Sequence, residues 1–359
     1  MEAMSKTNPV PIEDVFTRCY QHATGVTVGR PRVVQHLSRD YSEIFVLEFE
    51  VGDESRQIVG KRLIPHPSNE IYQNRPDPIR HEFETLEALS DKSLAISTSE
   101  FRVPTPRLVD SNEQCYFMDF VQGEELDSMM RRLRFFSPRA SLLQLSHTFF
   151  QAGRWLKEFQ LLTGIEYSDA SALESIVEHC EFRLRLIREH RDPRLPTDLS
   201  SIVLHRIESL MQQISAPIPI AGCHGDFGPW NMIANGNELT VLDFFAFRRE
   251  FIALDASNIL VTLENKLAAP SFSSWRVEKL VEKFVEGFSP EPILDARALQ
   301  VAETLYRVCS IQGCLASPGD IFRERLRTHR IVRRNLNWLL SENPQSVWDQ
   351  RIRTTQILK

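Results

Sequence analysis

The residues best suited to chemistry lie between positions 224 and 243. Asp226 and Asp243 flank Asn231, and His224 stands two residues before the first aspartate. Carboxylate and amide oxygens are hard ligands that suit Mg²⁺. One aspartate to face an incoming hydroxyl, with an asparagine and a second aspartate to hold metal, is the set of groups that phosphoryl transfer requires.

A predicted hairpin positions the two metal-ligand candidates. An Asn-Gly pair at 235–236 separates two apolar runs, and this pair favours a tight hairpin because both residues accept positive φ. The arms are predicted at 232–234 and 238–244, which places Asp243 on a strand. Folding the hairpin would return Asn231 and Asp243 to the same end. The alternative is a buried histidine with two solvated aspartates, but the turn and strand fall where the chemistry needs them.

This stretch resembles the aminoglycoside phosphotransferase family, the small-molecule branch of the protein-kinase-like fold that also holds choline kinase-like enzymes. The resemblance rests on His224-Gly225-Asp226, Asn231, Leu242-Asp243-Phe244 and Asp255. It implies ATP and Mg²⁺ as cofactors and a small hydroxylated molecule as the acceptor.

The same resemblance implies a role for each residue of the stretch. Asp226 would be the catalytic base, His224 would support the loop, and Asn231 and Asp243 would bind the metal. Asp255 would accept hydrogen bonds from the loop or from His224, or would cap the helix that it begins.

Two departures from the family pattern come after the second aspartate. Phe245 stands where a small or acidic residue is frequent, and residues 247–250, Phe-Arg-Arg-Glu, replace a Gly-x-x-Asp-Pro-like turn. These departures leave the metal-ligand candidates unchanged, and they affect the residues expected to contact the acceptor.

The fold class implied is α+β, a bilobal protein-kinase-like fold. A small, mainly antiparallel β lobe at residues 1–122 would bind the nucleotide. A larger, mainly helical lobe at residues 123–359 would carry the catalytic and acceptor-binding groups.

Lys61 is the candidate phosphate-binding cation of the first lobe. It ends the run Ile-Val-Gly-Lys at 58–61, which resembles the Val-Ala-Ile-Lys strand of kinases. The alternative is a solvated lysine at a strand end. A helix predicted at 79–90 resembles the family's Glu-x-x-x-Leu-x-x-Leu helix and makes Glu82 the partner of Lys61, with Glu84 as the competing choice. A salt bridge at the surface would contribute under about 1 kcal/mol to stability, so its role would be to position Lys61.

Two further nucleotide contacts are implied by the kinase-like fold. In kinase-like folds the turn between strands predicted at 32–37 and 43–51 covers the phosphates, usually with glycines, and this chain has none there. Backbone amides or the Ser42 hydroxyl would reach the phosphate oxygens instead. An ordinary turn is the alternative. After the strand predicted at 115–121, Met118 would pack on adenine while the Asp119 carbonyl and Val121 amide bond its edge. The alternative there is a plain core strand.

Composition places the chain in a broad class. Hydrophobic residues make up 42% and charged residues 25%, as in soluble globular proteins. No run of 18 apolar residues predicts a membrane span, and the first residues lack the apolar core of a signal peptide. The six cysteines are scattered without a CxxC pair, which indicates buried thiols in a reducing cytosol, so a cytoplasmic location is expected.

Positive charge is concentrated at the end of the chain. Residues 321–359 hold eight arginines and one lysine against three acidic residues. In a regular helix at 320–340, four of these arginines share one face: Arg323, Arg327, Arg330 and Arg334. This face is either a solvated surface or one that approaches an anionic acceptor, so we expect poor activity on polycationic aminoglycosides.

Three other classes of protein are alternatives to a small-molecule kinase. A nucleotide-binding pseudokinase or scaffold is the main alternative, which the intact Lys61, Asp226 and Asp243 disfavour. A protein kinase is disfavoured because His224-Gly225-Asp226 lacks the arginine of His-Arg-Asp and the chain has no Ala-Pro-Glu segment after Asp243. Nucleic-acid binding is not expected, because the basic surplus is confined to the tail. The acceptor's identity and the oligomeric state stay open.

Overall fold

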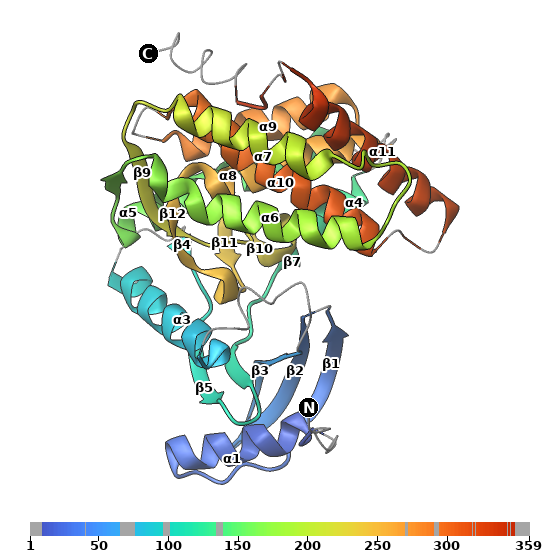
Figure 1. Cartoon of the computed structure of the whole chain (residues 1–359). Coiled ribbons are helices and arrows are strands. Elements are labelled where there is room, and N and C mark those ends of the chain that lie inside the picture. Colours follow the sequence, from blue (N-terminus) through green and yellow to red (C-terminus); the bar gives the residue numbers. More distant parts are fainter. Residues whose placement is uncertain are drawn as a thin grey trace, which may run out of the picture. The chain divides into compact units, whose positions relative to one another are not determined.

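The chain forms two compact units. The first comprises residues 1–98, 102–122 and 240–246, and the second comprises 99–101, 123–239 and 247–359. The chain passes from the first unit to the second after Gln122, and residues 240–246 return to the first unit. The computed structural model (Figure 1) describes residues 9–39, 41–64, 76–95, 101–133, 139–269, 272–290, 294–317, 319, 321–342, 344 and 346–348.

An antiparallel sheet of five strands is the centre of the first unit, in the order β1-β2-β3-β6-β5. Alternating apolar residues in the second strand place Leu47 and Phe49 in the core. The strands are β1 Arg32–Ser38, β2 Ser42–Val51, β3 Glu54–Leu63, β5 Pro106–Asp110 and β6 Cys115–Asp119.

Helix α1, Ile12–Thr24, covers this sheet with an apolar stripe. Its Phe16 is fully buried and meets the rings of Phe49 and Phe117 edge-on, at centroid distances of 4.8 and 5.3 Å. Helix α3, Pro78–Ala95, packs on β5 and on the short 3₁₀ turn η4, Phe244–Ala246. This second contact is how the segment after Asp243 belongs to the first unit.

The predicted hairpin is present, with strands β10 Met232–Asn235 and β11 Glu238–Val241. Gly236 has a φ of 60°, as the turn requires. The prediction that Asp243 lies on a strand is wrong. The second arm ends at Val241, Asp243 has a φ of 68°, and η4 begins at the next residue. Aspartate tolerates this left-handed conformation better than most residues, so the chain can leave the ladder there.

Helices dominate the second unit, and it also contains short strands beyond the predicted hairpin. A three-stranded antiparallel sheet has the order β12-β9-β8, with β8 Glu166–Ser168, β9 Ile218–Cys223 and β12 Arg248–Phe251. The hairpin joins short β4 Phe101–Arg102 and β7 Glu124–Glu125 in the order β4-β11-β10-β7. The helices are α4 Leu126–Arg132, α5 Arg139–Thr163, α6 Glu174–Glu189, α7 Leu199–Gln212, α8 Ala253–Asn265, α9 Ser274–Phe288, α10 Ala296–Ala316 and α11 Phe322–Leu340.

Two glycines allow α5 and α9 to approach backbone to backbone. A Cβ atom at Gly153 would stand 2.2 Å from the carbonyl oxygen of Phe284. A Cβ atom at Gly287 would stand 2.1 Å from the carbonyl oxygen of Phe150. Both distances are far below van der Waals contact, so this pair of helices requires glycine on both faces.

The C-terminal part of the described chain returns to the core of the second unit. Trp348 is 1% exposed, and its indole Nε1 donates to Ser257 Oγ of α8 at 3.3 Å. Ser346 Oγ donates to Glu303 Oε2 at 2.7 Å, and Glu303 in turn pairs with the buried Arg307. Among the described helices, none has the length and apolar character needed to cross a bilayer.

Candidate functional site

The loop that begins at His224 is fixed to helix α8 by Asp255. Strand β9 ends at Cys223, and the next two backbone N–H groups point at one carboxylate. His224 N donates to Asp255 Oδ2 at 2.6 Å, and Gly225 N donates to Asp255 Oδ1 at 2.9 Å. The expectation that Asp255 receives hydrogen bonds from the loop therefore agrees with the structure.

The alternative expectation, that Asp255 caps its helix, is wrong. Helix α8 begins at Ala253 with Ile252 before it, so Asp255 lies within the first turn. The side chain is fully buried. Burial raises the pKa of Asp255 to about 6, and the two backbone N–H bonds only partly counter this.

Three neighbours in the loop orient Asp226. Its backbone N donates to Nδ1 of the fully buried His224 at 3.3 Å. Its Oδ2 accepts hydrogen bonds from Trp230 Nε1 and Asn231 Nδ2, both at 3.0 Å. Both side-chain donors therefore meet the carboxylate at the same oxygen, Oδ2. Sequence reasoning missed Trp230, although it stands only four residues after Asp226.

The same bonds decide which atom of Asn231 can bind a cation. Its Nδ2 donates to both the carbonyl oxygen and Oδ2 of Asp226, at 2.9 and 3.0 Å. The amide nitrogen is therefore committed to the loop, and Oδ1 is the atom left to act as a ligand. The 3₁₀ turn η3, Pro229–Asn231, fixes this side chain just before β10 begins.

Aromatic side chains of helix α5 support the loop that carries Asp226. Phe227 is fully buried and stacks on Trp155 of α5 at a centroid distance of 5.5 Å. Trp155 stacks on Phe159 at 5.1 Å. Gly228 leaves room for the Trp230 ring, since a Cβ atom there would stand 2.2 Å from it. The loop therefore rests on a rigid helix, as a positioned catalytic group requires.

Within the first unit, Lys61 is held by two carboxylates. Its Nζ lies 2.8 Å from Glu82 Oε1 and 2.7 Å from Asp243 Oδ1. Glu84 is exposed, and Glu82 is the helix glutamate that pairs with Lys61. Tyr116 OH also donates to Glu82 Oε1 at 3.0 Å, a contact that sequence reasoning missed. The assumption of a surface pair was wrong, because the side chains of Lys61 and Glu82 are 4% and 0% exposed.

Burial and charge act against each other in this cluster. Burial lowers the pKa of Lys61, but Asp243 and Glu82 together raise it above its ordinary value. Burial raises the pKa of Glu82 to about 7, even though Lys61 lowers it. The Asp243 side chain is 38% exposed, so it is the member of the cluster that can meet a ligand.

Of the remaining nucleotide candidates, Ser42, Met118 and Asp119 lie on the same sheet and Val121 follows it. Met118 is buried in β6, where it pairs with Val59 of β3. The Asp119 side chain forms a two-pronged ion pair with Arg107, at 2.7 and 2.6 Å, and β6 ends there, two residues before Val121. Ser42 is the buried first residue of β2. The sheet thus carries these residues beside Lys61, but their contacts with a nucleotide stay predictions.

Each predicted metal ligand, taken by itself, offers an oxygen that suits a hard divalent cation: Asn231 of the second unit has an amide oxygen, and Asp243 of the first has a carboxylate. Within the described residues no group of three or more His, Cys, Asp or Glu side chains could hold a metal alone. Mg²⁺ is commonly bound by one or two protein oxygens, with substrate phosphates and water completing the shell. The residues present therefore suit a cation that arrives with a nucleotide.

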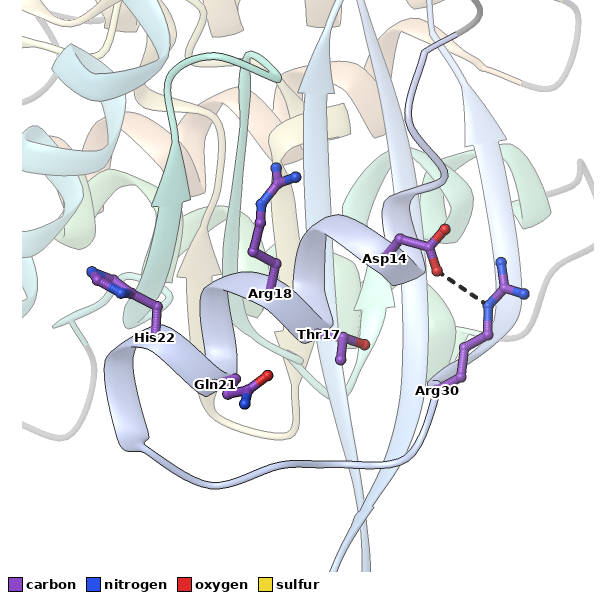
Figure 2. Close-up of a pocket in the computed structure, with 6 residues that line it drawn as sticks. All are labelled: Asp14, Thr17, Arg18, Gln21, His22 and Arg30. Carbon is purple, nitrogen blue, oxygen red and sulfur yellow. Dashed lines mark ion pairs between the residues drawn. The ribbon is translucent and has the colours of Figure 1, made fainter.

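A surface hollow along α1 is a separate feature (Figure 2). Asp14 and Arg30 face each other across it at 3.4 Å, and both are well exposed. Exposed ion pairs of this kind contribute little to the stability of the fold. None of the predicted site residues lines the hollow. Its lining residues are Asp14, Thr17, Arg18, Gln21, His22 and Arg30.

The sequence profile of the phosphotransferase enzyme family matches residues 47–298, which include the cluster at Lys61 and the whole loop to Asp255. The chain belongs to this family. The predicted family resemblance is thereby confirmed, and the chain is a phosphotransferase enzyme. No curated protein matches this phosphotransferase by sequence.

Solved structures show the same fold at low sequence identity. An amicoumacin kinase matches with 14% identity and a TM-score of 0.55, over 88% of this chain and 91% of that one. A choline kinase from Cryptosporidium parvum matches with 12% identity and a TM-score of 0.54, over 92% and 100%. A glucosamine kinase matches with 12% identity and a TM-score of 0.50, over 90% and 99%. The predicted α+β, protein-kinase-like fold is confirmed.

Proposed function

We propose that this phosphotransferase moves the γ-phosphoryl group of ATP to a hydroxyl of a small molecule. The observation that carries the proposal is the fixed carboxylate of Asp226, held by Trp230 and Asn231 on a loop anchored to Asp255. Such positioning is what phosphoryl transfer demands of a protein, because the transition state is loose and little covalent chemistry is required.

Structures of similar fold support the choice of cofactors. The amicoumacin kinase structure contains AMP-PNP and Ca²⁺ together with Ami. The glucosamine kinase structure contains glucosamine, ADP and inorganic phosphate. We therefore assign ATP as the phosphoryl donor and Mg²⁺ as the working cation of this chain.

The reaction is an in-line displacement. The acceptor's hydroxyl oxygen forms a bond to the γ-phosphorus while the bond to the β–γ bridging oxygen breaks, and ADP leaves with that electron pair. Asp226 Oδ1 accepts the hydroxyl proton. A carboxylate is a weak base, but it suffices when proton transfer is late in a loose transition state.

The remaining residues bind and orient the nucleotide. Lys61, held by Glu82, contacts the α- and β-phosphates, and backbone amides or the hydroxyl at Ser42 contact the phosphates from the β1–β2 turn. Met118 packs on adenine, and the Asp119 carbonyl and Val121 amide bond its edge. Mg²⁺ on Asn231 and Asp243 would supply charge neutralisation at the transferring phosphoryl group.

An acceptor screen tests the proposal directly. ATP consumption and a product gain of one phosphoryl mass would be followed with hydroxylated sugars, amino alcohols, hydroxy acids and nucleosides. Product formation that requires Mg²⁺ and ATP supports the proposal. The alternative, a nucleotide-binding scaffold, predicts Mg-ATP binding by calorimetry with no product from any acceptor.

A further inference from the structure

The beginning of helix α11 carries a group of apolar side chains that are exposed to solvent. Ile321, Phe322 and Leu326 are 57%, 79% and 39% exposed. Among the described residues, Phe322 is the most exposed of the large apolar side chains. Single apolar side chains are ordinary at a protein surface, but three within so short a stretch form a group. Such a group indicates a surface that meets a partner.

The packing of α11 explains why this group stays exposed. The side chains that α11 buries all lie in its second half: Ile331, Val332, Asn335, Trp338 and Leu339. From Phe322 to Arg330, a stretch that the structure describes throughout, no side chain is buried. The second half of the helix therefore holds it to the second unit, and Phe322 and Leu326 add nothing to the core.

Arginine is concentrated on the same helix. Helix α11 has six arginines and one acidic residue, Glu324. Phe322 and Leu326 lie one turn apart on the side opposite the buried residues, and together they form an apolar ridge. By the same helical spacing, arginines stand on both sides of this ridge. The exposed arginines of the helix are Arg323, Arg325, Arg327, Arg330 and Arg333.

The arginine face predicted from the sequence divides into two parts. Arg330 Nη1 donates to the carbonyl oxygen of Ala268 at 3.4 Å, and Arg334 Nη1 donates to the carbonyl oxygen of Glu264 at 3.2 Å. These two arginines cover carbonyl groups at the end of α8 and just beyond it, which is a structural role. The other two, Arg323 and Arg327, stand beside the apolar ridge and are exposed.

We propose that the first turns of α11 dock on the surface of an anionic lipid bilayer. A helix that combines exposed Phe and Leu with arginine lies in the plane of such a surface, with its apolar side chains at the boundary of headgroups and acyl chains. The long arginine side chains extend sideways to the lipid phosphates while the ridge inserts. A neutral apolar partner would leave these guanidinium groups without counter-charges. The inference goes beyond the proposed function and does not depend on it.

Helix α9 shows that apolar exposure alone is not sufficient for this role. Trp275 is 58% exposed there, but α9 has three cationic and three acidic residues. Lys279 pairs with Glu282, and Lys283 pairs with Glu286. This helix has no net charge, so an anionic surface would not attract it. Trp275 therefore serves as an internal control for Phe322.

Vesicle co-sedimentation, without nucleotide or acceptor, tests the proposal on the whole protein. The vesicles would contain phosphatidylcholine alone, or phosphatidylcholine with phosphatidylglycerol. Binding should require the anionic lipid, because the arginines supply the attraction. It should weaken as the salt concentration rises, because salt screens that attraction.

Two sets of substitutions separate the contributions of charge and apolar contact. The triple variant Arg323→Gln, Arg325→Gln and Arg327→Gln should bind anionic vesicles about a hundredfold more weakly, at about fivefold for each arginine. The double variant Phe322→Ser and Leu326→Ser should bind about tenfold more weakly, because the ridge can no longer insert. All five side chains are exposed, so the Tm of each variant should match that of the wild type.

Each set has a matched control in the second unit. Trp275→Ser removes an exposed aromatic ring from the uncharged helix α9. Lys279→Gln, Lys283→Gln and Arg297→Gln together remove the same number of positive charges from α9 and α10. Both controls should bind anionic vesicles as the wild type does.

Several outcomes would overturn the inference. The first is the absence of binding to anionic vesicles, and the second is an equal loss in the arginine variant and its charge control. Unchanged binding of the Phe322→Ser and Leu326→Ser variant would show that no ridge inserts. Tighter binding to duplex RNA than to anionic vesicles would assign the arginines to nucleic acid. Self-association by light scattering that the same double variant abolishes, without vesicle binding, would assign the ridge to a second copy of the chain.

Discussion

Asp226 is the residue whose chemistry is easiest to isolate. Asp226→Asn keeps the side chain's shape, and Trp230 and Asn231 can still donate to its oxygen, so Mg-ATP binding should persist. The amide cannot accept a proton from the acceptor, so phosphoryl transfer should fall by at least about a hundredfold. Single-turnover kinetics beside nucleotide titration would measure both quantities. Near-normal turnover in the variant would refute the assignment.

Trp230→Phe serves as the control for that experiment. It removes one hydrogen bond to Asp226 Oδ2 but keeps an aromatic ring beside Gly228. A loss intermediate between the wild type and Asp226→Asn is expected, because the carboxylate stays but is less well oriented.

The buried carboxyl of Asp255 makes a pH-dependent contribution to stability. Its pKa is raised to about 6 in the folded state from 3.8 in the unfolded chain. Between these values the folded state holds the proton more tightly, so this contribution is fully present below pH 3.8 and is lost as the pH rises through 6. The total change is on the order of 3 kcal/mol.

Urea unfolding of wild type and Asp255→Asn across pH 4 to 7 would measure this effect. Asparagine does not titrate, so its own contribution should not change with pH. The free energy of unfolding of the wild type should therefore fall relative to that of Asp255→Asn as the pH rises. Parallel curves for the two proteins would contradict the shifted pKa. The variant should also lose activity at every pH, since it replaces one of the two oxygens that accept from His224 and Gly225.

Single residues were predicted unevenly, for physical reasons. The types and spacing of Asp226, Asn231 and Asp243 are local properties of the chain, so sequence reasoning reaches them. The choice of Glu82 over Glu84 depends on which helix face turns inward, and only packing decides that. Tyr116 was missed because its hydroxyl meets Glu82 across 34 residues of sequence.

At the scale of elements, the α5–α9 contact should tolerate no added methyl group. Gly153→Ala would place a Cβ atom only 2.2 Å from the Phe284 carbonyl oxygen. Overpacking of this kind costs about 1 to 3 kcal/mol, and more where backbone must move. Denaturant unfolding should show that loss.

Gly313→Ala on α10 is the matched control for the helix contact. A Cβ atom there meets nothing within 4 Å, so alanine should be neutral or stabilise the helix by up to about 1 kcal/mol. Equal effects at Gly153 and Gly313 would show that the close approach of α5 and α9 is not what limits substitution.

Elements with strong periodic signals were predicted well, and short ones were not. The Asn-Gly turn located the hairpin, but the strand ended before Asp243 because the chain turns left-handed there. Strands β9 and β12 have only six and four residues and lie within a mainly helical unit. Short apolar runs do not distinguish a strand from a buried helix segment, so their pairing in register was not foreseen.

At the scale of the whole molecule, the family match ends at residue 298, yet the later helical residues are tied to the matched part. Arg307 of α10 pairs with Glu264 of α8 at 2.6 Å and lies over the Trp338 ring at 4.5 Å. The bilobal class was implied by the family resemblance of the motifs. These long-range contacts were not, because nothing local in the sequence marks which helices share a buried charge.

The burial of Trp348 leads to the last prediction. Its ring is fully enclosed, and its indole N–H bonds Ser257, two residues from the loop anchor Asp255 on α8. Trp348→Ala should lower the free energy of unfolding by about 3 to 5 kcal/mol, because a large buried ring is removed. Trp275→Ala is the control, since that ring is 58% exposed on α9 and its loss should change stability little. Urea unfolding of the two variants would decide the matter, and equal losses would show that the C-terminal segment does not secure α8.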